Sequence, residues 1–328
     1  MRLLKLVPDD TNIGFLKWRN IAFGVSTLLM IISWILILTK GLNYGVDFIG
    51  GQMIRVTFTQ NTSAPVGDLR IKVGKLGYGD PTIQRFGKEN QVSIRLKLPK
   101  GTEKNPDLAN KMADKITANL KASYPGVRID GVDSVSGKVS SELFQKGFLA
   151  LLAAAIGVSA YIWLRFEWQF GVGAIWALVH DVSLTFGLFA LTGMEFDLNT
   201  IAALLTLIGY SLNDTVVVYD RIRENLMKFR KMEMGALLDL SVNETLSRTV
   251  MTTLSILLPL SMLVFFGPDV IFGFSLAMTF GIFVGGYSSI YMAAPILIWL
   301  KVGSDSFVPV DGVANKNDRM TEGYGAQA

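Results

Sequence analysis

The feature that most constrains this fold is an apolar run of 20 residues at 20–39, followed later by several others of similar length. About 20 apolar residues in a helix cross a bilayer's hydrocarbon core. A cleaved signal peptide has a shorter apolar core and a small-residue cleavage site, and neither is present here. We therefore expect an uncleaved transmembrane helix at 20–40. Half of the 328 residues are hydrophobic and the mean hydropathy is +0.40, which favours a multispanning membrane protein.

The C-terminal half holds the remaining predicted spans. Helices 2–6 are expected at approximately 144–164, 169–192, 199–219, 249–266 and 272–301. Residues 303–328 are polar and contain glycine, a composition that predicts a disordered tail.

Residues 41–142 are more polar than the predicted spans, as expected of a segment in water, and they predict a folded α+β domain. Apolar residues alternate with polar ones in two clear strand patterns, and an i+4 apolar repeat marks an amphipathic helix. The expected order is β-α-β-β-α-β, with helices at 65–77 and 107–123, which suggests a ferredoxin-like fold of roughly 90 residues. One sheet face would stay open, either as part of a solvated spacer or as a surface that contacts a partner or client.

The distribution of basic residues predicts the topology. The loops 193–198 and 267–271 contain no Lys or Arg, whereas the loop 220–248 and the N-terminal segment 1–19 contain several. The positive-inside rule then puts both termini and 220–248 in the cytoplasm, and 41–142 in the periplasm. Long domains translocate largely regardless of their charge, so the basic excess in 41–142 does not change this assignment.

Composition also excludes several function classes. The chain has no cysteine and a single histidine, so it offers no thiolate or histidine-rich metal site. No nucleophile constellation, P-loop or metal-ligand spacing is present, so we expect no enzyme, no catalytic residue and no cofactor. Because the basic excess is confined to one segment, nucleic acid is not expected as a partner.

Two polar residues, Asn213 and Asp214, interrupt the fourth predicted span. An aspartate at such depth costs about 2.5–3.5 kcal/mol on insertion scales. The carboxylate either handles an ion or is hydrogen-bonded into the bundle with a structural role. Arg248, at the start of the fifth span, falls in the same cytoplasmic half, so its guanidinium can reach toward Asp214 if the helices are neighbours. The alternative for Arg248 is an interfacial anchor whose charge snorkels into water.

The third span carries His180 and Asp181 near its middle. Proton handling and helix packing both remain open for this pair. In the sixth span small residues recur every four positions, which predicts tight packing against another helix, either internal or in another subunit. The stripe consists of Gly273, Ala277, Gly281, Gly285, Ser289 and Ala293.

Several segments resemble a known family. Residues 41–51, GLNYGVDFIGG, are similar to the G-x-D-F-x-G-G signature of the SecD/SecF family of protein-export membrane proteins. Residues 193–225, 243–253 and 179–181 resemble further regions on the SecF side of that family. The signature positions are Gly45, Asp47, Phe48, Gly50 and Gly51.

The resemblance implies half of a twelve-helix core of the resistance-nodulation-division type, completed by SecD in a heterodimer. A chain with six spans resembles free SecF and not a SecD–SecF fusion. The family resides in the bacterial cytoplasmic (inner) membrane, surrounded by lipid. It associates with the SecYEG channel and, in many bacteria, with YajC. It uses the proton motive force to draw unfolded preprotein clients outward after the ATP-driven stage.

The same resemblance makes Asp214 and Arg248 the ion-pathway carboxylate and arginine. One such carboxylate in six spans gives half of a relay, so the other half is expected on another chain. Whether protons or sodium ions are coupled stays open. Two alternatives remain: a translocon scaffold that moves no ions, and half of a small-molecule exporter, although a domain of roughly 90 residues encloses little.

Overall fold

The computed structural model describes residues 7–8, 11–60, 62–85, 88–98 and 107–303. The predicted tail at 303–328 lies outside these residues, apart from Gly303. Within them, six helices are long and apolar enough to cross a membrane, so the predicted number of spans is confirmed. They are α1 (Arg19–Lys40, after a short 3-10 turn at Phe15–Trp18), α5 (Gly137–Arg165), α6 (Trp168–Thr192), α7 (Leu198–Lys228), α8 (Met234–Phe266) and the sixth, in which α9 (Phe272–Ser288), a π-helical segment (Ser289–Ala293) and α10 (Ala294–Trp299) follow one another.

The predicted loop 220–248 is mostly helical. Helix α7 continues to Lys228 and α8 already begins at Met234, so only residues 229–233 connect them. Both extensions bury apolar side chains, including Leu226 and Leu238. Charged residues mark where a span leaves the hydrocarbon, but they do not end a helix that still has an apolar face to bury.

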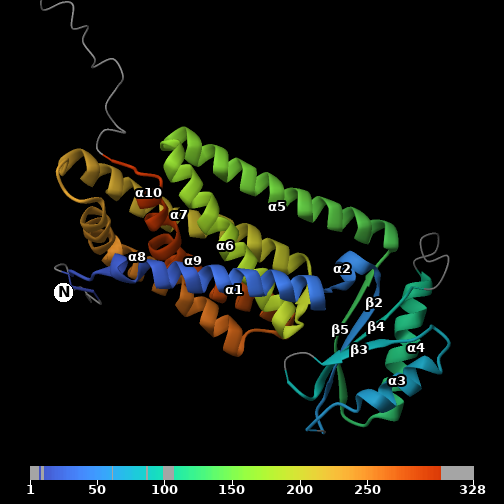
Figure 1. The fold of residues 1–328 in the computed structure, drawn as a ribbon. Coiled ribbons are helices and arrows are strands. Elements are labelled where there is room, and N and C mark those ends of the chain that lie inside the picture. Colours follow the sequence, from blue (N-terminus) through green and yellow to red (C-terminus); the bar gives the residue numbers. More distant parts are fainter. Residues whose placement is uncertain (1–6, 9–10, 61, 86–87, 99–106, 304–328) are drawn as a thin grey trace, which may run out of the picture.

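Helices α6, α7 and α9 form the centre of the bundle. The most apolar stretches of α6, α7 and the sixth span, which begins with α9, are 56%, 50% and 67% buried, whereas those of α1, α5 and α8 are 17%, 11% and 11% buried. Figure 1 shows α1 and α5 on the outside of the bundle. The polar groups of α6, α7 and α9 therefore lie deepest in the protein.

The small-residue stripe of the sixth span packs against α7, so its neighbour is internal. A Cβ atom on Gly281 would lie 2.6 Å from a terminal methyl carbon of Leu207, and one on Gly285 would lie 3.3 Å from Cβ of Ser211. Farther along, the carbonyl of Ala293 accepts a hydrogen bond from the Tyr219 hydroxyl at 3.2 Å. Small residues let the two backbones approach closely along most of this helix pair.

The α+β domain lies between α1 and α5 and has the predicted element order. Its elements are β2 (Gly51–Phe58), α3 (Val66–Gly74), β3 (Thr82–Arg85), β4 (Gln91–Leu96), α4 (Asp107–Ser123) and β5 (Val127–Val135). The sheet is antiparallel in the order β3-β4-β2-β5, as the ferredoxin-like arrangement requires. Helices α3 and α4 cover one face (Figure 1) and bury alternate residues such as Ile54 and Ile94.

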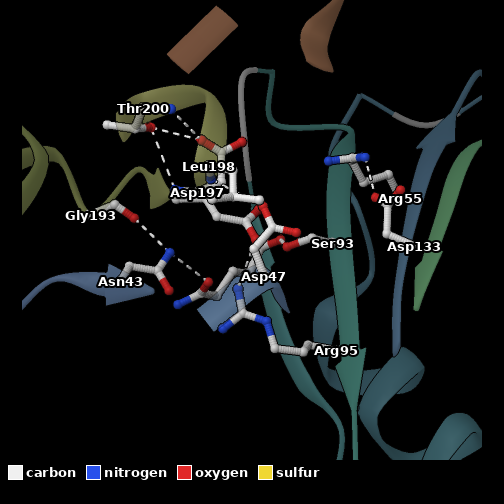
Figure 2. Close-up of polar contacts among 12 residues, drawn as sticks. Asn43, Asp47, Arg55, Ser93, Arg95, Asp133, Gly193, Asp197, Leu198 and Thr200 are labelled. Carbon is white, nitrogen blue, oxygen red and sulfur yellow. Dashed lines mark hydrogen bonds and ion pairs between the residues drawn. The ribbon is translucent and has the colours of Figure 1, made fainter. Parts of the chain in front are cut away.

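Two short elements that the sequence did not predict tie this domain to the bundle. Strand β1 (Asn43–Tyr44) pairs in parallel with β6 (Glu195–Phe196), which lies in the turn between α6 and α7. Helix α2 (Val46–Ile49) follows β1 and leads directly into β2. The sheet face opposite α3 and α4 carries Arg55 and Arg95, and Figure 2 shows it turned toward the α6–α7 turn.

Candidate functional site

Asp214 lies in the middle of α7 and is 2% exposed. Its Oδ2 atom has no hydrogen-bond partner among the described residues. Arg248 and Thr253, both of α8, lie near its carboxyl group. The structure therefore brings Asp214 and Arg248 to one seam between α7 and α8, as the sequence predicted for neighbouring helices.

A second contact lies along the same seam. The Tyr210 hydroxyl donates a hydrogen bond to Oγ1 of Thr253 at 3.4 Å. The Thr252 hydroxyl bonds the carbonyl of Arg248 at 3.0 Å and stays within its own helix. The sequence does not indicate Thr253 as a contact of α7, because the spacing along one helix does not show which residue meets the neighbouring helix.

Arg248 and Asn213 both face outward from the six-helix bundle. Both residues are exposed, and no ion pair joins Arg248 to Asp214 among the described residues. A charged side chain and an amide at membrane depth are costly when they face lipid. This edge of the bundle is thus chemically suited to a protein neighbour.

Asp181, in contrast, is a fully satisfied carboxylate in the bundle core. It is 0% exposed and accepts hydrogen bonds from the hydroxyls of Ser211 on α7 and Ser288 on α9, the latter at 2.8 Å. Nδ1 of His180 lies 2.9 Å from its other oxygen. Asp181 thereby connects α6, α7 and α9, and no local pattern in the sequence indicates Ser288 as its partner.

The signature residues lie at the junction between the bundle and the α+β domain. Oδ2 of Asp47 accepts a hydrogen bond from the backbone N–H of Leu198, the first residue of α7, at 3.1 Å (Figure 2). Phe48 packs in an aromatic group with Tyr44, Phe144 and Phe196, at ring-centroid distances of 6.3, 5.8 and 6.0 Å.

The three signature glycines stand where a side chain would clash or strain the backbone. A Cβ atom on Gly45 would lie 2.9 Å from Oε1 of Glu195, and one on Gly51 would lie 2.6 Å from the carbonyl oxygen of Leu96. Gly50 and Gly51 also adopt φ angles of +74° and +124°, which side-chain-bearing residues rarely adopt. Glycine is therefore required here by close approach and by backbone conformation.

An ion pair crosses the same junction. Arg95 of β4 lies 3.2 Å from Oε1 of Glu195 in the α6–α7 turn, and both side chains are largely buried. Burial raises the pKa of the Glu195 carboxyl, and the attraction of Arg95 only partly offsets this. A cleft of about 400 Å³ opens beside the pair, with Arg55, Arg85 and Asp197 in its lining.

Among the described residues, no group of three His, Cys, Asp or Glu side chains could hold a metal ion. The polar groups of this chain can bind and release a proton, form or break hydrogen bonds, and connect helices.

Comparisons with known proteins place these features in a family. Residues 115–303 match the family described as protein export membrane protein SecD/SecF, C-terminal, and residues 35–62 match the SecD/SecF GG motif. The chain is 46% identical over 306 residues to protein translocase subunit SecF of Rhodobacter capsulatus, covering 90% of this chain and 91% of that relative. It is 42% identical over 295 residues to the SecF subunit of Rickettsia akari, covering 90% and 94%.

Solved structures agree. The chain is similar to SecDF, a translocon-associated membrane protein from Thermus thermophilus, with a TM-score of 0.78, 34% identity, and coverage of 89% of this chain and 39% of that chain. It is also similar to SecDF in a super-membrane-facing form, with a TM-score of 0.60, 32% identity, and coverage of 92% and 40%. The chain thus spans about two fifths of the length of these SecDF chains.

Proposed function

Since the chain belongs to the SecD/SecF family of protein-export membrane proteins, we propose that it uses the proton motive force, together with SecD, to complete preprotein export after the ATP-driven stage. In this proposal Asp214 takes up and releases the coupling proton. Arg248 approaches or leaves the carboxylate during the cycle. Asn213 lines the same route.

The observation that carries the proposal is the contrast between two buried carboxylates. Asp181 has hydrogen-bond partners from three residues, whereas Oδ2 of Asp214 has none among the described residues. A carboxylate held in a low-dielectric site changes its proton affinity when a nearby cation moves. Proton relays in membrane pumps use Asp, Glu and His in this way.

The exposed edge at Asn213 and Arg248 supports a partner that completes the relay. The matched SecDF chains are more than twice as long as the part that this chain covers. The uncovered part is long enough to include a second set of spans. In the proposal SecD supplies these spans in a heterodimer. SecYEG and, in many bacteria, YajC are the further partners.

The proposed location is the bacterial cytoplasmic membrane, with both termini in the cytoplasm and the α+β domain in the periplasm. The short loops around 193–198 and 267–271 lack basic residues, which supports this orientation. Unfolded preproteins leaving the channel would then meet the α+β domain.

The test is export of a preprotein into inverted inner-membrane vesicles that carry the chain with SecD and SecYEG. Asp214→Asn is expected to abolish the part of late export that depends on the proton gradient, while the ATP-driven stage persists. Asp220→Asn is the matched control, because Asp220 lies on the same helix but is exposed and paired with Arg165. Unchanged late export with Asp214→Asn would favour a scaffold that moves no ions.

The coupling ion is tested in the same vesicles. Imposing a pH gradient and a sodium gradient separately shows which of them drives late export. The proposal expects the pH gradient to suffice. Export driven by sodium alone would assign Asp214 to sodium instead.

A further inference from the structure

The signature segment occupies a place that proton handling at Asp214 does not explain. It lies between the first residue of α7 and the first residue of β2, at the junction shown in Figure 2. Besides the bond from Leu198 to Asp47, the N–H of Gly45 donates to the carbonyl of Phe196 at 2.8 Å. The segment is therefore fixed to the amino end of the helix that carries Asp214.

The amino end of α7 is held by two carboxylates from different parts of the chain. The first N–H groups of a helix have no partner within the helix. Asp197 accepts from the N–H of Thr200 at 2.8 Å in a capping box, and Asp47 accepts from that of Leu198 at 3.1 Å. Both negative charges also lie at the positive end of the helix dipole. Asp47 therefore makes a charge-assisted bond to the backbone of α7 itself.

On its other side, the segment is fixed to the sheet. Gly51 begins β2, the strand that pairs with both β4 and β5. Its close approach to the carbonyl of Leu96 leaves no room for a side chain. Only the end of α2 and Gly50 separate Asp47 from this strand, so Asp47 and β2 can move little relative to one another.

We propose that Asp47 is a positioning residue that couples axial movement of α7 to strand β2, so that a change at Asp214 displaces the sheet of the α+β domain. This inference rests on the proposed function, because Asp214 supplies the movement. Asp214 lies 16 residues beyond Leu198 along α7, about 24 Å away. A continuous helix carries displacement over that length through its backbone hydrogen bonds.

Side chains of the sheet also make polar contacts across the junction, but those of Arg95 and Gln84 do not reach α7. Arg95 bonds Glu195, and the Asn43 side chain donates to Oε1 of Gln84 at 2.9 Å. Both contacts join the sheet to β1 or to the α6–α7 turn through side-chain ends. The bond from the Leu198 N–H to Asp47, in contrast, joins the signature segment directly to the backbone of α7.

The test removes either the acceptor or the donor of the hydrogen bond between Asp47 and the Leu198 N–H. Asp47→Ala removes the acceptor, whereas Asp47→Asn keeps an oxygen in its place. Leu198→Pro removes the donor N–H at the first helical position, where proline is tolerated. The preceding residue, Asp197, has φ −120° and ψ −175°, the extended conformation that a following proline favours. Leu198→Ala is the matched control, because it loses the side chain but keeps the N–H.

Two readouts separate coupling from proton handling: gradient-driven export, and proton flux through the complex measured with a pH-sensitive dye. Asp47→Ala and Leu198→Pro are each expected to lower export about tenfold, because each removes one partner of the charge-assisted hydrogen bond. Proton flux stays near the wild-type rate. The double variant is no worse than either single one, and Asp47→Asn and Leu198→Ala keep most export.

The outcomes distinguish the two proposals. If Asp214→Asn abolishes export but Asp47→Ala does not, the coupling role of Asp47 is wrong while the proposed function stands. If Asp47→Ala abolishes flux and export together, Asp47 acts on the ion path and the coupling role is again wrong. If Asp214→Asn changes neither readout, the proposed function is wrong.

A disulfide provides a second test that holds even if Asp47→Ala lowers the amount of protein. The chain has no cysteine, and Tyr44 and Phe196 are direct partners in the β1–β6 pair. Neighbouring strands lie about 4.8 Å apart, within the Cα spacing of a disulfide. Tyr44→Cys with Phe196→Cys in the Asp47→Ala background is expected to recover export when oxidised and lose it when reduced. Equal export in the two states, at equal protein levels, would overturn the coupling role.

Discussion

Asp214 of α7 and Arg248 of α8 lie on neighbouring helices, and no ion pair joins the two side chains among the described residues. Arg248 is exposed, while Asp214 is buried. The interface between α7 and α8 thus holds a buried carboxylate and an exposed guanidinium. Such an arrangement suits a group that must be charged in one conformation and neutral in another.

Removing the charge of Arg248 should lower proton-driven export without unfolding the protein. We expect Arg248→Ala to reduce late export about tenfold, equivalent to roughly 1.4 kcal/mol in the barrier. The side chain is exposed and makes no described ion pair, so the amount of protein in the membrane should be unchanged. Arg230→Ala, at an exposed position between α7 and α8, is the control. Wild-type export with Arg248→Ala would show that Arg248 is only an interfacial anchor.

Asp181 should matter for stability through its hydrogen bonds. Asp181→Ala leaves Ser211, Ser288 and His180 without their acceptor, and a buried unsatisfied donor costs about 1–3 kcal/mol. Asp181→Asn keeps an oxygen that both serines can use, so its loss should be smaller. Thermal unfolding in detergent measures both. Equal melting temperatures for the two variants would contradict this structural role.

The stripe on α9 should tolerate no added side chain at Gly285. A Cβ atom there would lie 3.3 Å from Cβ and 3.5 Å from Cα of Ser211, so the α7 backbone would have to move. We expect Gly285→Ala to destabilise the protein by about 1–3 kcal/mol. Gly157→Ala is the control, because nothing lies within 4 Å of its Cβ position. Equal thermal stability of the two variants would show that α7 and α9 are not tightly packed.

Glu195 should make the junction pH-dependent. Because its pKa is raised in the folded protein, the protonated carboxyl is favoured there, and stability is lost as the pH rises through the folded pKa. Glu195→Gln resembles the protonated form. We expect it to be at least as heat-stable as wild type at about pH 7.5, with a difference that shrinks toward about pH 5. A variant less stable than wild type at pH 7.5 would show that the attraction of Arg95 outweighs burial.

The sequence predicted the spans and the α+β domain because both depend on local pattern. Apolar length determines the helices, and alternation of apolar and polar residues determines strands such as β2 and β4. The sequence does not predict the helical extensions across 220–248, because charged residues show where a span leaves the membrane but not where its helix ends.

The contacts that define the sites could not be predicted in the same way. Ser288 and Asp181 are 107 positions apart, and Asp47 and Leu198 are 151 apart. Nothing local shows which serine or which helix end a carboxylate will meet. Asp214 could be found, because a charge inside an apolar run is visible without knowledge of its partners.

The most direct measurement is proton flux into proteoliposomes that contain this chain and SecD, with wild-type Asp214 or with Asp214→Asn, under an imposed pH gradient. Our account predicts flux when both chains are present and Asp214 is intact, and background flux when either chain is omitted or Asp214 is replaced. Wild-type flux through the Asp214→Asn complex would contradict it.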